Sequence, residues 1–225
     1  MRKGILYVIM LAMLCRCGED KKSAEPAPSP TATITKDSTT NSSIKTIIFF
    51  GNSLTAGYGV DPLQAFPALI QKKIDSLHLT YKAINAGVSG ETSSGGLARI
   101  DWILRQAPDV FVLELGGNDG LRGIPLSETK KNLQAIITRV REKRPDTKII
   151  IAGMMMPPNL GQQYTREFQS IYPNLAKNNQ ASLIPFLLEG VGGEVELNQA
   201  DGIHPTAEGH RIVAENVWKV VKTLL

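Results

Sequence analysis

The chain has 225 residues, of which 42% are hydrophobic and 20% charged, so it can form one domain with a sizeable core and an extension. Its formal net charge is +4, but Lys and Arg are scattered among acidic residues and form no basic stripe with interleaved aromatic residues, which argues against a nucleic-acid partner. The sequence also lacks the glycine fingerprint of dinucleotide-binding proteins, the phosphate-binding loop motif and the helical zinc motif.

The first 17 residues have the pattern of a secretory signal peptide. Arg2 and Lys3 are basic, and the apolar run Gly4–Leu14 that follows them is too short to span a bilayer comfortably. Residues 1–17 therefore predict export, with the mature protein in the periplasm or attached to the bacterial envelope.

The two cysteines of the sequence, Cys15 and Cys17, follow this apolar run directly. Because one residue separates them, they cannot readily form a disulfide that staples a domain. A bacterial lipoprotein, attached to the membrane through an acylated Cys17 or Cys15, is the alternative interpretation. Arg16 and Leu14, which precede the two cysteines, are not the small residues that lipoprotein cleavage sites prefer, so lipidation stays open.

Residues 18–43 are predicted to be a disordered tether. Ser, Thr, Pro, Ala and Lys dominate this segment, and Ile34 is its only large apolar residue. Such a composition cannot bury enough apolar surface to offset the entropy lost on ordering. The folded domain is therefore expected to span residues 44–225.

Strands and helices are predicted to alternate through this domain. Short apolar runs predict strands at 45–50, 81–85, 109–115, 148–153 and 182–186. Apolar residues at helical spacing predict helices at 62–79, 91–106, from about 127 to 140, 164–175 and 206–225. This alternation predicts an α/β fold in which a parallel sheet is covered by helices on both faces, and it leaves the spatial order of the strands open.

Predicted turns rich in Gly and Asn follow these strands, and in a parallel sheet such turns gather at one edge, where ligands bind. Ser53 follows the first strand, and Asp201 and His204 precede the last helix. A serine hydroxyl becomes a good nucleophile when a neutral imidazole takes its proton and a carboxylate holds that imidazole. The backbone amides of Ser53 and Gly87, with the side-chain amide of Asn118, are predicted to stabilise the oxyanion that forms.

Four segments, GNSLTAGYG, NAGVSGET, GGND and DGIHP, resemble in this order the four sequence blocks of the SGNH (GDSL-type) hydrolases. The match runs from about residue 45 to the C-terminus, and its details are most similar to the thioesterase/lysophospholipase/arylesterase subgroup. The resemblance implies a flavodoxin-like three-layer α/β/α sandwich and hydrolysis of acyl esters without a cofactor or metal. Carried over position by position, it implies a Ser53–His204–Asp201 triad and an oxyanion hole formed by Ser53, Gly87 and Asn118.

One residue departs from the family pattern. The usual Gly-Asp-Ser is Gly51-Asn52-Ser53 in this chain. Because that Asp is not the carboxylate of the triad, Asn52 is expected to tune the turn rather than abolish catalysis. Thr55 also breaks the G-x-S-x-G pattern, which argues against the α/β-hydrolase fold.

Residues around these blocks have competing interpretations. Met155, Met156 and Pro157 are predicted to line an acyl pocket, since Met adapts to varied apolar ligands, although plain core packing is open for two of Met154–Met156. His210 is expected to be a packing or surface histidine, and Asp119 a turn-former or helix cap rather than a catalytic group. Arg122 is expected to be solvated, with contact to an anionic substrate group as the alternative.

The sequence therefore predicts an exported serine esterase that acts on a small-molecule or lipid acyl ester or thioester through an acyl-enzyme. Within enzymes, a carbohydrate O-deacetylase that uses the same site is the alternative. A non-catalytic surface binding protein on a hydrolase scaffold is the alternative outside enzymes, prompted by Asn52. Acyl length, leaving group, natural substrate and oligomeric state stay open, because loops that spacing cannot place form the pocket walls.

Overall fold

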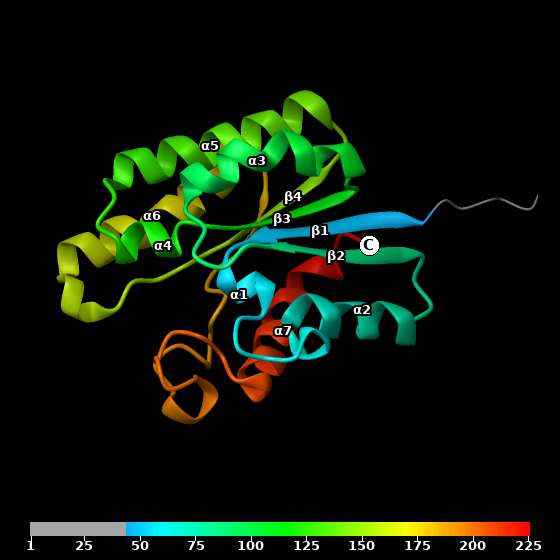
Figure 1. The fold of residues 1–225 in the computed structure, drawn as a ribbon. Helices are drawn as coiled ribbons and strands as arrows, with labels where there is room; N and C mark the ends of the chain where they lie inside the picture. The colour runs from blue at the N-terminus through cyan, green and yellow to red at the C-terminus, as the bar shows by residue number, and fades with distance from the viewer. Residues whose placement is uncertain (1–43) are drawn as a thin grey trace, which may run out of the picture. The chain divides into compact units, whose positions relative to one another are not determined.

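The computed structural model describes residues 44–225, and the predictions of a signal peptide at 1–17, a lipidated Cys17 or Cys15 and a tether at 18–43 lie outside the described residues. Within residues 44–225 the chain forms a five-stranded sheet in which every pairing is parallel (Figure 1). The strands are β1 (Lys45–Gly51), β2 (Tyr81–Gly87), β3 (Val110–Glu114), β4 (Lys148–Ala152) and β5 (Ser182–Ile184). Their spatial order, β2-β1-β3-β4-β5, is that of flavodoxin-like folds.

Helices cover both faces of the sheet, which confirms the predicted three-layer α/β architecture (Figure 1). On one face lie α3 (Ser93–Ile103), α5 (Leu126–Lys143) and α6 (Gln162–Asn178), and on the other lie α2 (Phe66–Ser76) and α7 (Ala207–Val221). The short helices α1 (Ser53–Ala56) and α4 (Gly117–Leu121) follow β1 and β3. None of the helices among residues 44–225 is both long and apolar enough to cross a membrane.

The two central strands carry the core. Side chains 47–50 of β1 are fully buried, and those of 110–113 in β3 are at most 1% exposed. Such continuous apolar runs are expected when helices cover both faces of a parallel strand. Phe49 packs edge-on against Phe66 of α2 with ring centroids 5.5 Å apart, and Phe50 packs on Phe111 at 5.4 Å.

Local hydrogen bonds set element boundaries that the hydrophobic pattern alone leaves approximate. Helix α3 begins at Ser93, two residues later than predicted, because the Thr92 side chain accepts the Gly95 N–H as an N-cap. Thr206 caps α7 in the same way, through the Gly209 N–H. Strand β5 ends at Ile184 rather than at 186, since Pro185 has no N–H to continue the ladder.

The register of the sheet brings three strand ends together. Gly51, at the end of β1, pairs with Gly87 at the end of β2 and with Glu114 at the end of β3. The turns that follow these strands therefore emerge side by side at the carboxyl edge of the sheet, where ligands bind in open α/β folds.

Candidate active site

The turn between β1 and α1 places Ser53 at this edge. Asn52 is the N-cap of α1, and its Oδ1 accepts the Leu54 N–H at 2.9 Å. Helix α1 makes one turn and stops at Gly57, whose φ of 78° is left-handed. Because Ser53 is the first residue of α1, its N–H has no acceptor within the helix and is available to a ligand.

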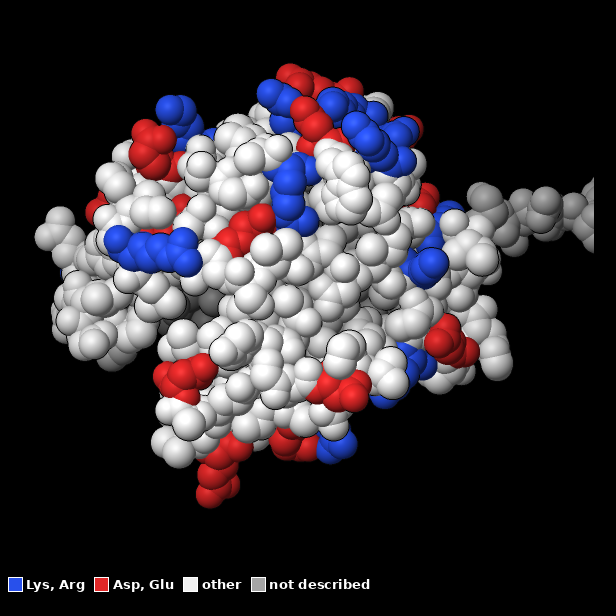
Figure 2. All heavy atoms as spheres, in the orientation of Figure 1, with Lys and Arg blue, Asp and Glu red and all other residues white. Residues whose placement is uncertain are grey.

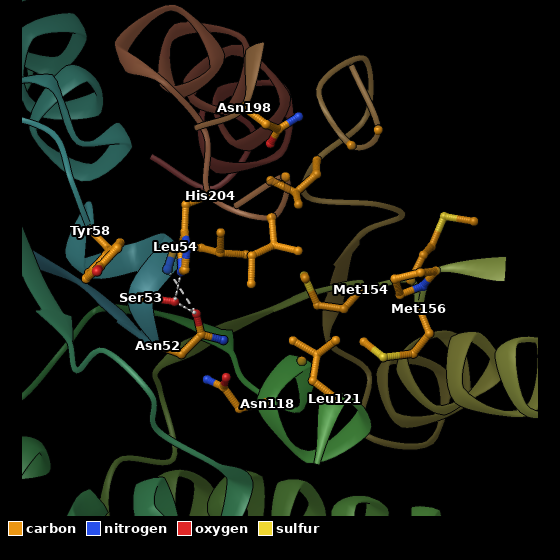
Figure 3. Close-up of a pocket in the computed structure, with 18 of the residues that line it drawn as sticks. Asn52, Ser53, Leu54, Tyr58, Asn118, Leu121, Met154, Met156, Asn198 and His204 are labelled. Carbon is orange, nitrogen blue, oxygen red and sulfur yellow. Dashed lines mark hydrogen bonds between the residues drawn. The ribbon is translucent and has the colours of Figure 1, made fainter. Parts of the chain in front are cut away.

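The structure brings Ser53, His204 and Asp201 into one hydrogen-bonded chain (Figure 3). His204 Nε2 lies 2.8 Å from Ser53 Oγ, and its Nδ1 lies 2.7 Å from Asp201 Oδ2. Ser53 and His204 are 151 positions apart in the chain, whereas Asp201 and His204 share a single turn. The arrangement lets an imidazole take the serine proton while a carboxylate fixes the imidazole tautomer.

Asp201 is held in its ionised form by its own turn. Its Oδ1 accepts the backbone N–H groups of Ile203 at 3.0 Å and His204 at 3.1 Å, while Oδ2 faces the imidazole. The hydrogen bond with His204, followed by the one from the Ile203 N–H, lowers the pKa of Asp201 to about 2. The carboxylate is therefore anionic at neutral pH and can stabilise an imidazolium.

Two further contacts, which the sequence patterns did not single out, align His204 with Ser53. The Tyr58 ring packs on the His204 ring with centroids 4.6 Å apart. Gln199 Nε2 donates to the carbonyls of Tyr58 at 2.7 Å and Pro205 at 3.0 Å, so it joins the loop after α1 to the turn that carries the imidazole. The sequence carries no local signal for these contacts, because Tyr58 is far along the chain from His204 and lies 141 positions from Gln199.

Gly87 is a correction to the predicted oxyanion hole. Its N–H donates to Asn85 Oδ1 at 3.0 Å, and Gly87 does not line the cavity beside Ser53. A Cβ added there would collide with the backbone N of Ala56 and lie 2.8 Å from the Asn52 carbonyl oxygen. Because Gly87 has no side chain, β2 can closely approach the turn that carries Ser53.

The glycine that does line the cavity is Gly90, three residues later in the same block. Its φ is 80°, its N–H donates to no atom of residues 44–225, and its carbonyl accepts from Arg122 Nη2 at 2.9 Å. Asn118 also lines the cavity, and one N–H of its amide donates to the Glu91 carbonyl at 2.9 Å. The N–H groups of Ser53 and Gly90 and the second N–H of Asn118 thus surround one hollow.

Other residues with competing interpretations have structural roles. Asp119 is buried within α4 and accepts hydrogen bonds from the N–H and the hydroxyl of Ser93, so it joins α4 to the start of α3 instead of capping its own turn. His210 is 1% exposed and its Nδ1 accepts the Phe66 N–H at 3.3 Å, which confirms a packing histidine. Arg122 is exposed, but its guanidinium braces the Gly90 carbonyl rather than standing free in solvent.

A cavity of about 530 Å³ extends from Ser53. Figure 3 shows Ser53, Tyr58 and His204 on one side of it and Met154 and Met156 on the other. Met155, Met156 and Pro157 line the cavity as predicted, and their contact with substrate stays a prediction. The other lining side chains include the apolar residues Leu54, Leu121, Phe186, Leu188 and Ile203 and the polar residues Asn52, Ser89, Asn118 and Asn198.

The surroundings of the cavity carry little charge. No Asp, Glu, Lys or Arg is among the lining residues within the described chain. Figure 2 shows that uncharged residues make up most of the face of the molecule on which α1 lies. Residues 44–225 contain no group of three His, Cys, Asp or Glu side chains that could hold a metal ion. The apolar part of the lining can bind an apolar group beside Ser53.

Comparison with known proteins adds independent evidence. A sequence model of the GDSL-like lipase/acylhydrolase family matches residues 49–212. The chain is 39% identical to Esterase TesA of Pseudomonas aeruginosa over 188 residues, which are 83% of this chain and 92% of that protein. It is 37% identical to thioesterase 1/protease 1/lysophospholipase L1 of Escherichia coli K12 over 181 residues, 80% of this chain and 85% of that protein. The crystal structure of TesA superposes with a TM-score of 0.77 at 40% identity, covering 80% of this chain and all of that one.

Proposed function

The chain belongs to the GDSL-like lipase/acylhydrolase family, and from this premise we propose that it is an exported serine esterase that cleaves acyl esters or thioesters through an acyl-enzyme. Membership confirms the resemblance predicted from the four sequence blocks, and the chain is a carboxylic ester hydrolase. The observation that carries the mechanism is the hydrogen-bonded chain from Ser53 Oγ through His204 to Asp201, with lengths of 2.8 and 2.7 Å.

Acylation follows from this geometry. Ser53 Oγ attacks the acyl carbonyl while His204 Nε2 takes the hydroxyl proton, and Asp201 stabilises the imidazolium. The N–H groups of Ser53, Gly90 and Asn118 stabilise the oxyanion. When the tetrahedral intermediate collapses, the bond to the leaving oxygen or sulfur breaks and His204 protonates that atom, which leaves the acyl group on Ser53.

Deacylation repeats these steps with water. His204 takes a proton from the water as its oxygen attacks the acyl carbonyl. Collapse of the second tetrahedral intermediate breaks the bond to Ser53 Oγ, which takes the proton back from His204. The carboxylic acid leaves and the free enzyme is restored.

The cavity supports an acyl group longer than acetyl. Its volume of about 530 Å³ and its lining by Leu121, Met154 and Met156 suit an alkyl chain that starts at Ser53. A sugar would need several hydrogen-bonding partners in place of these apolar side chains. The geometry therefore favours acyl esters and thioesters over the carbohydrate O-deacetylase, and the complete triad gives no support to a non-catalytic binding protein.

Active-site labelling tests the nucleophile. We expect a fluorophosphonate probe to label the wild-type protein and Ser170→Ala, an exposed serine of α6, but not Ser53→Ala. Turnover of p-nitrophenyl butyrate should disappear in Ser53→Ala. The variant should still unfold in a cooperative thermal transition, as the wild-type protein does. Labelling or full turnover by Ser53→Ala would refute the assignment.

A series of acyl lengths tests the substrate class. With p-nitrophenyl esters from acetyl to dodecanoyl, kcat/KM should rise beyond acetyl, because each buried CH₂ contributes about 0.8 kcal/mol. Activity confined to acetyl groups would instead favour the deacetylase.

Cell fractionation tests export. The support for export is the N-terminal sequence, with its basic start and the apolar run Gly4–Leu14. The protein should be found outside the cytoplasm of a bacterial host, and metabolic labelling with a fatty acid, compared between wild type, Cys17→Ala and Cys15→Ala, decides on lipidation. Retention of the full-length chain in the cytoplasm would contradict export.

A further inference from the structure

A buried carboxylate that the proposed mechanism does not use lies beneath the turn that carries Ser53. Glu114 is the last residue of β3, pairs with Gly51 in the sheet register and is 1% exposed. It takes part in none of the ion pairs among residues 44–225. A charge-bearing group so deeply buried is costly unless its surroundings satisfy it.

Three donors from the Ser53 turn satisfy it. Glu114 Oε1 accepts from Asn52 Nδ2 at 2.7 Å, and Oε2 accepts from the Asn52 N–H at 3.0 Å and the Thr55 hydroxyl at 2.8 Å. All three partners donate, so both oxygens of Glu114 accept, and an ionised carboxylate, which can only accept, matches all three donors.

Glu114 thereby fixes the orientation of the Asn52 side chain. With Nδ2 directed at Glu114, Oδ1 of Asn52 is left to accept the Leu54 N–H at 2.9 Å, and it lies 3.4 Å from Ser53 Oγ. A reversed amide would place two acceptors against each other at Glu114 and two donors against each other at Leu54. The carboxylate thus determines the N-cap of the helix that begins at Ser53.

The space around Gly51 shows how closely the carboxylate is packed. A Cβ added at Gly51 would collide with Glu114 Oε2 and with the Thr55 hydroxyl, and would lie 2.8 Å from the Glu114 carbonyl oxygen. The strand end and the carboxylate are therefore in direct contact, so a change at Glu114 is transmitted to the backbone just before Ser53.

We propose that Glu114 is a positioning residue for Ser53 that acts through the side-chain amide of Asn52, so that in this chain residues 52 and 114 act as a matched donor–acceptor pair. The proposal rests on the proposed role of Ser53 as nucleophile. An amide at 114 alone places its NH₂ against a donor in either orientation, the side-chain NH₂ or the backbone N–H of Asn52, and a carboxyl at 52 alone places two carboxyls against each other. When the two are exchanged, every donor again meets an acceptor.

Burial and the hydrogen bonds act on the ionisation of Glu114 in opposite directions. Burial raises the pKa of Glu114 to about 7, against the hydrogen bonds from Asn52 and Thr55, which lower it. The charge of Glu114 also contributes, after burial, to the raised pKa of Tyr172 of α6, whose hydroxyl donates to the Leu115 carbonyl. Above neutral pH the carboxylate form prevails and all three hydrogen bonds are made.

Exchanging the pair tests the proposal. In Glu114→Gln, kcat for p-nitrophenyl butyrate and the rate of fluorophosphonate labelling should both fall by up to about 100-fold, with KM nearly unchanged, since the substrate-lining residues are untouched. The double variant Asn52→Asp/Glu114→Gln should recover kcat to within severalfold of wild type. The single variant Asn52→Asp keeps activity only while the two carboxyls share a proton, so its pH profile gains an alkaline limb that wild type and the double variant lack.

Glu167→Gln on the exposed surface of α6 is the matched control and should behave as wild type. Full activity of Glu114→Gln, or a double variant that folds but stays as slow as Glu114→Gln, would overturn the proposal. If Glu114→Gln does not fold, the other two variants test the proposal. A double variant that folds but is slow, or an Asn52→Asp variant without the alkaline limb, would overturn it. A wild-type protein that the probe fails to label would instead contradict the proposed function itself.

Discussion

The two ends of the cavity are built in different ways. At one end, hydrogen bonds of 2.7 to 2.8 Å join Ser53, His204 and Asp201. Gln199 holds the turns around them through hydrogen bonds to the carbonyls of Tyr58 and Pro205. At the other end, Met154, Met155 and Met156 line the wall with apolar side chains, and Met155 is 41% exposed. Catalysis at the first end depends on the positions of single atoms, whereas binding at the second end depends on the volume that the side chains leave free. Changes at the first should therefore cost orders of magnitude in rate, and changes at the second small factors.

The largest effect is expected from Asp201→Asn, which changes a single atom at the polar end. The new amide can still accept the N–H groups of Ile203 and His204, but its NH₂ faces Nδ1 and forces the imidazole proton onto Nε2, the wrong tautomer. We expect kcat for p-nitrophenyl butyrate to fall by about 10⁴-fold. Asp146→Asn, an exposed residue outside the site, is the control, and a loss below tenfold would contradict a catalytic Asp201.

Asn118→Ala should have the next largest effect, because it removes one donor of the proposed oxyanion hole. We expect kcat to fall by about 10²–10³-fold. KM should change little, since the donor acts on the charge that develops in the transition state. Asn174→Ala on the exposed surface of α6 serves as the control. Equal losses in binding and turnover would mean that Asn118 acts on the ground state instead.

Met156→Phe probes the apolar end. Met156 is 8% exposed and lines the cavity on the side away from Ser53 (Figure 3), so a larger ring there shortens the space for an acyl chain. The ratio of kcat/KM for long over short p-nitrophenyl esters should fall about fourfold for each CH₂ that no longer fits, at about 0.8 kcal/mol per CH₂. Leu77→Phe, at an exposed residue after α2, should leave the ratio unchanged. A uniform loss at all chain lengths would place the effect at the polar end.

His210→Asn should change stability and leave kcat nearly unchanged, which separates the second histidine from His204. Burial, with a smaller contribution from the charge of His204, lowers the pKa of His210 to about 4. Because the ordinary value is 6.5, the unfolded chain binds a proton that the folded chain excludes between these values. The stability contributed by neutral His210, at most about 3 kcal/mol, is complete above pH 6.5 and is lost as the pH falls toward 4.

Urea unfolding at pH 7 and pH 4.5 measures this loss as the difference between wild type and His210→Asn. The comparison between wild type and variant is needed because the raised pKa of Glu114 changes the stability with pH in the opposite direction. Protonation of Glu114 in the fold favours the folded state as the pH falls from about 7 toward 4.5, and both variants retain this contribution. Parallel pH dependence in the two proteins would contradict the assignment to His210.

Most of the fold was predictable from sequence because its signals are local. Buried parallel strands such as 47–50 are continuous apolar runs, and the helices that cover them repeat their apolar residues at helical spacing. The pairing of Asp201 with His204 was also predictable, since three positions in one turn bring the two side chains within 2.7 Å.

The oxyanion hole could be predicted only in part. Gly87 and Gly90 lie in the same block, and each can bring its backbone close to a ligand. The path of the chain decides between them, because the Gly87 N–H is used by Asn85 and Gly90 reaches the cavity. Arg122, Gln199 and Glu114 were not assigned their supporting roles, since each acts on a residue at least 30 positions away.

The sequence by itself determined the alternation of strands and helices, the polar turns at the strand ends and the chemical groups of the triad, all of which arise from interactions between neighbours in the chain. The tertiary structure alone decided the strand order, the choice of Gly90 and which other apolar residues join Met155, Met156 and Pro157 along the cavity. Those features depend on which distant segments meet when the chain packs, and residue spacing carries no information on that.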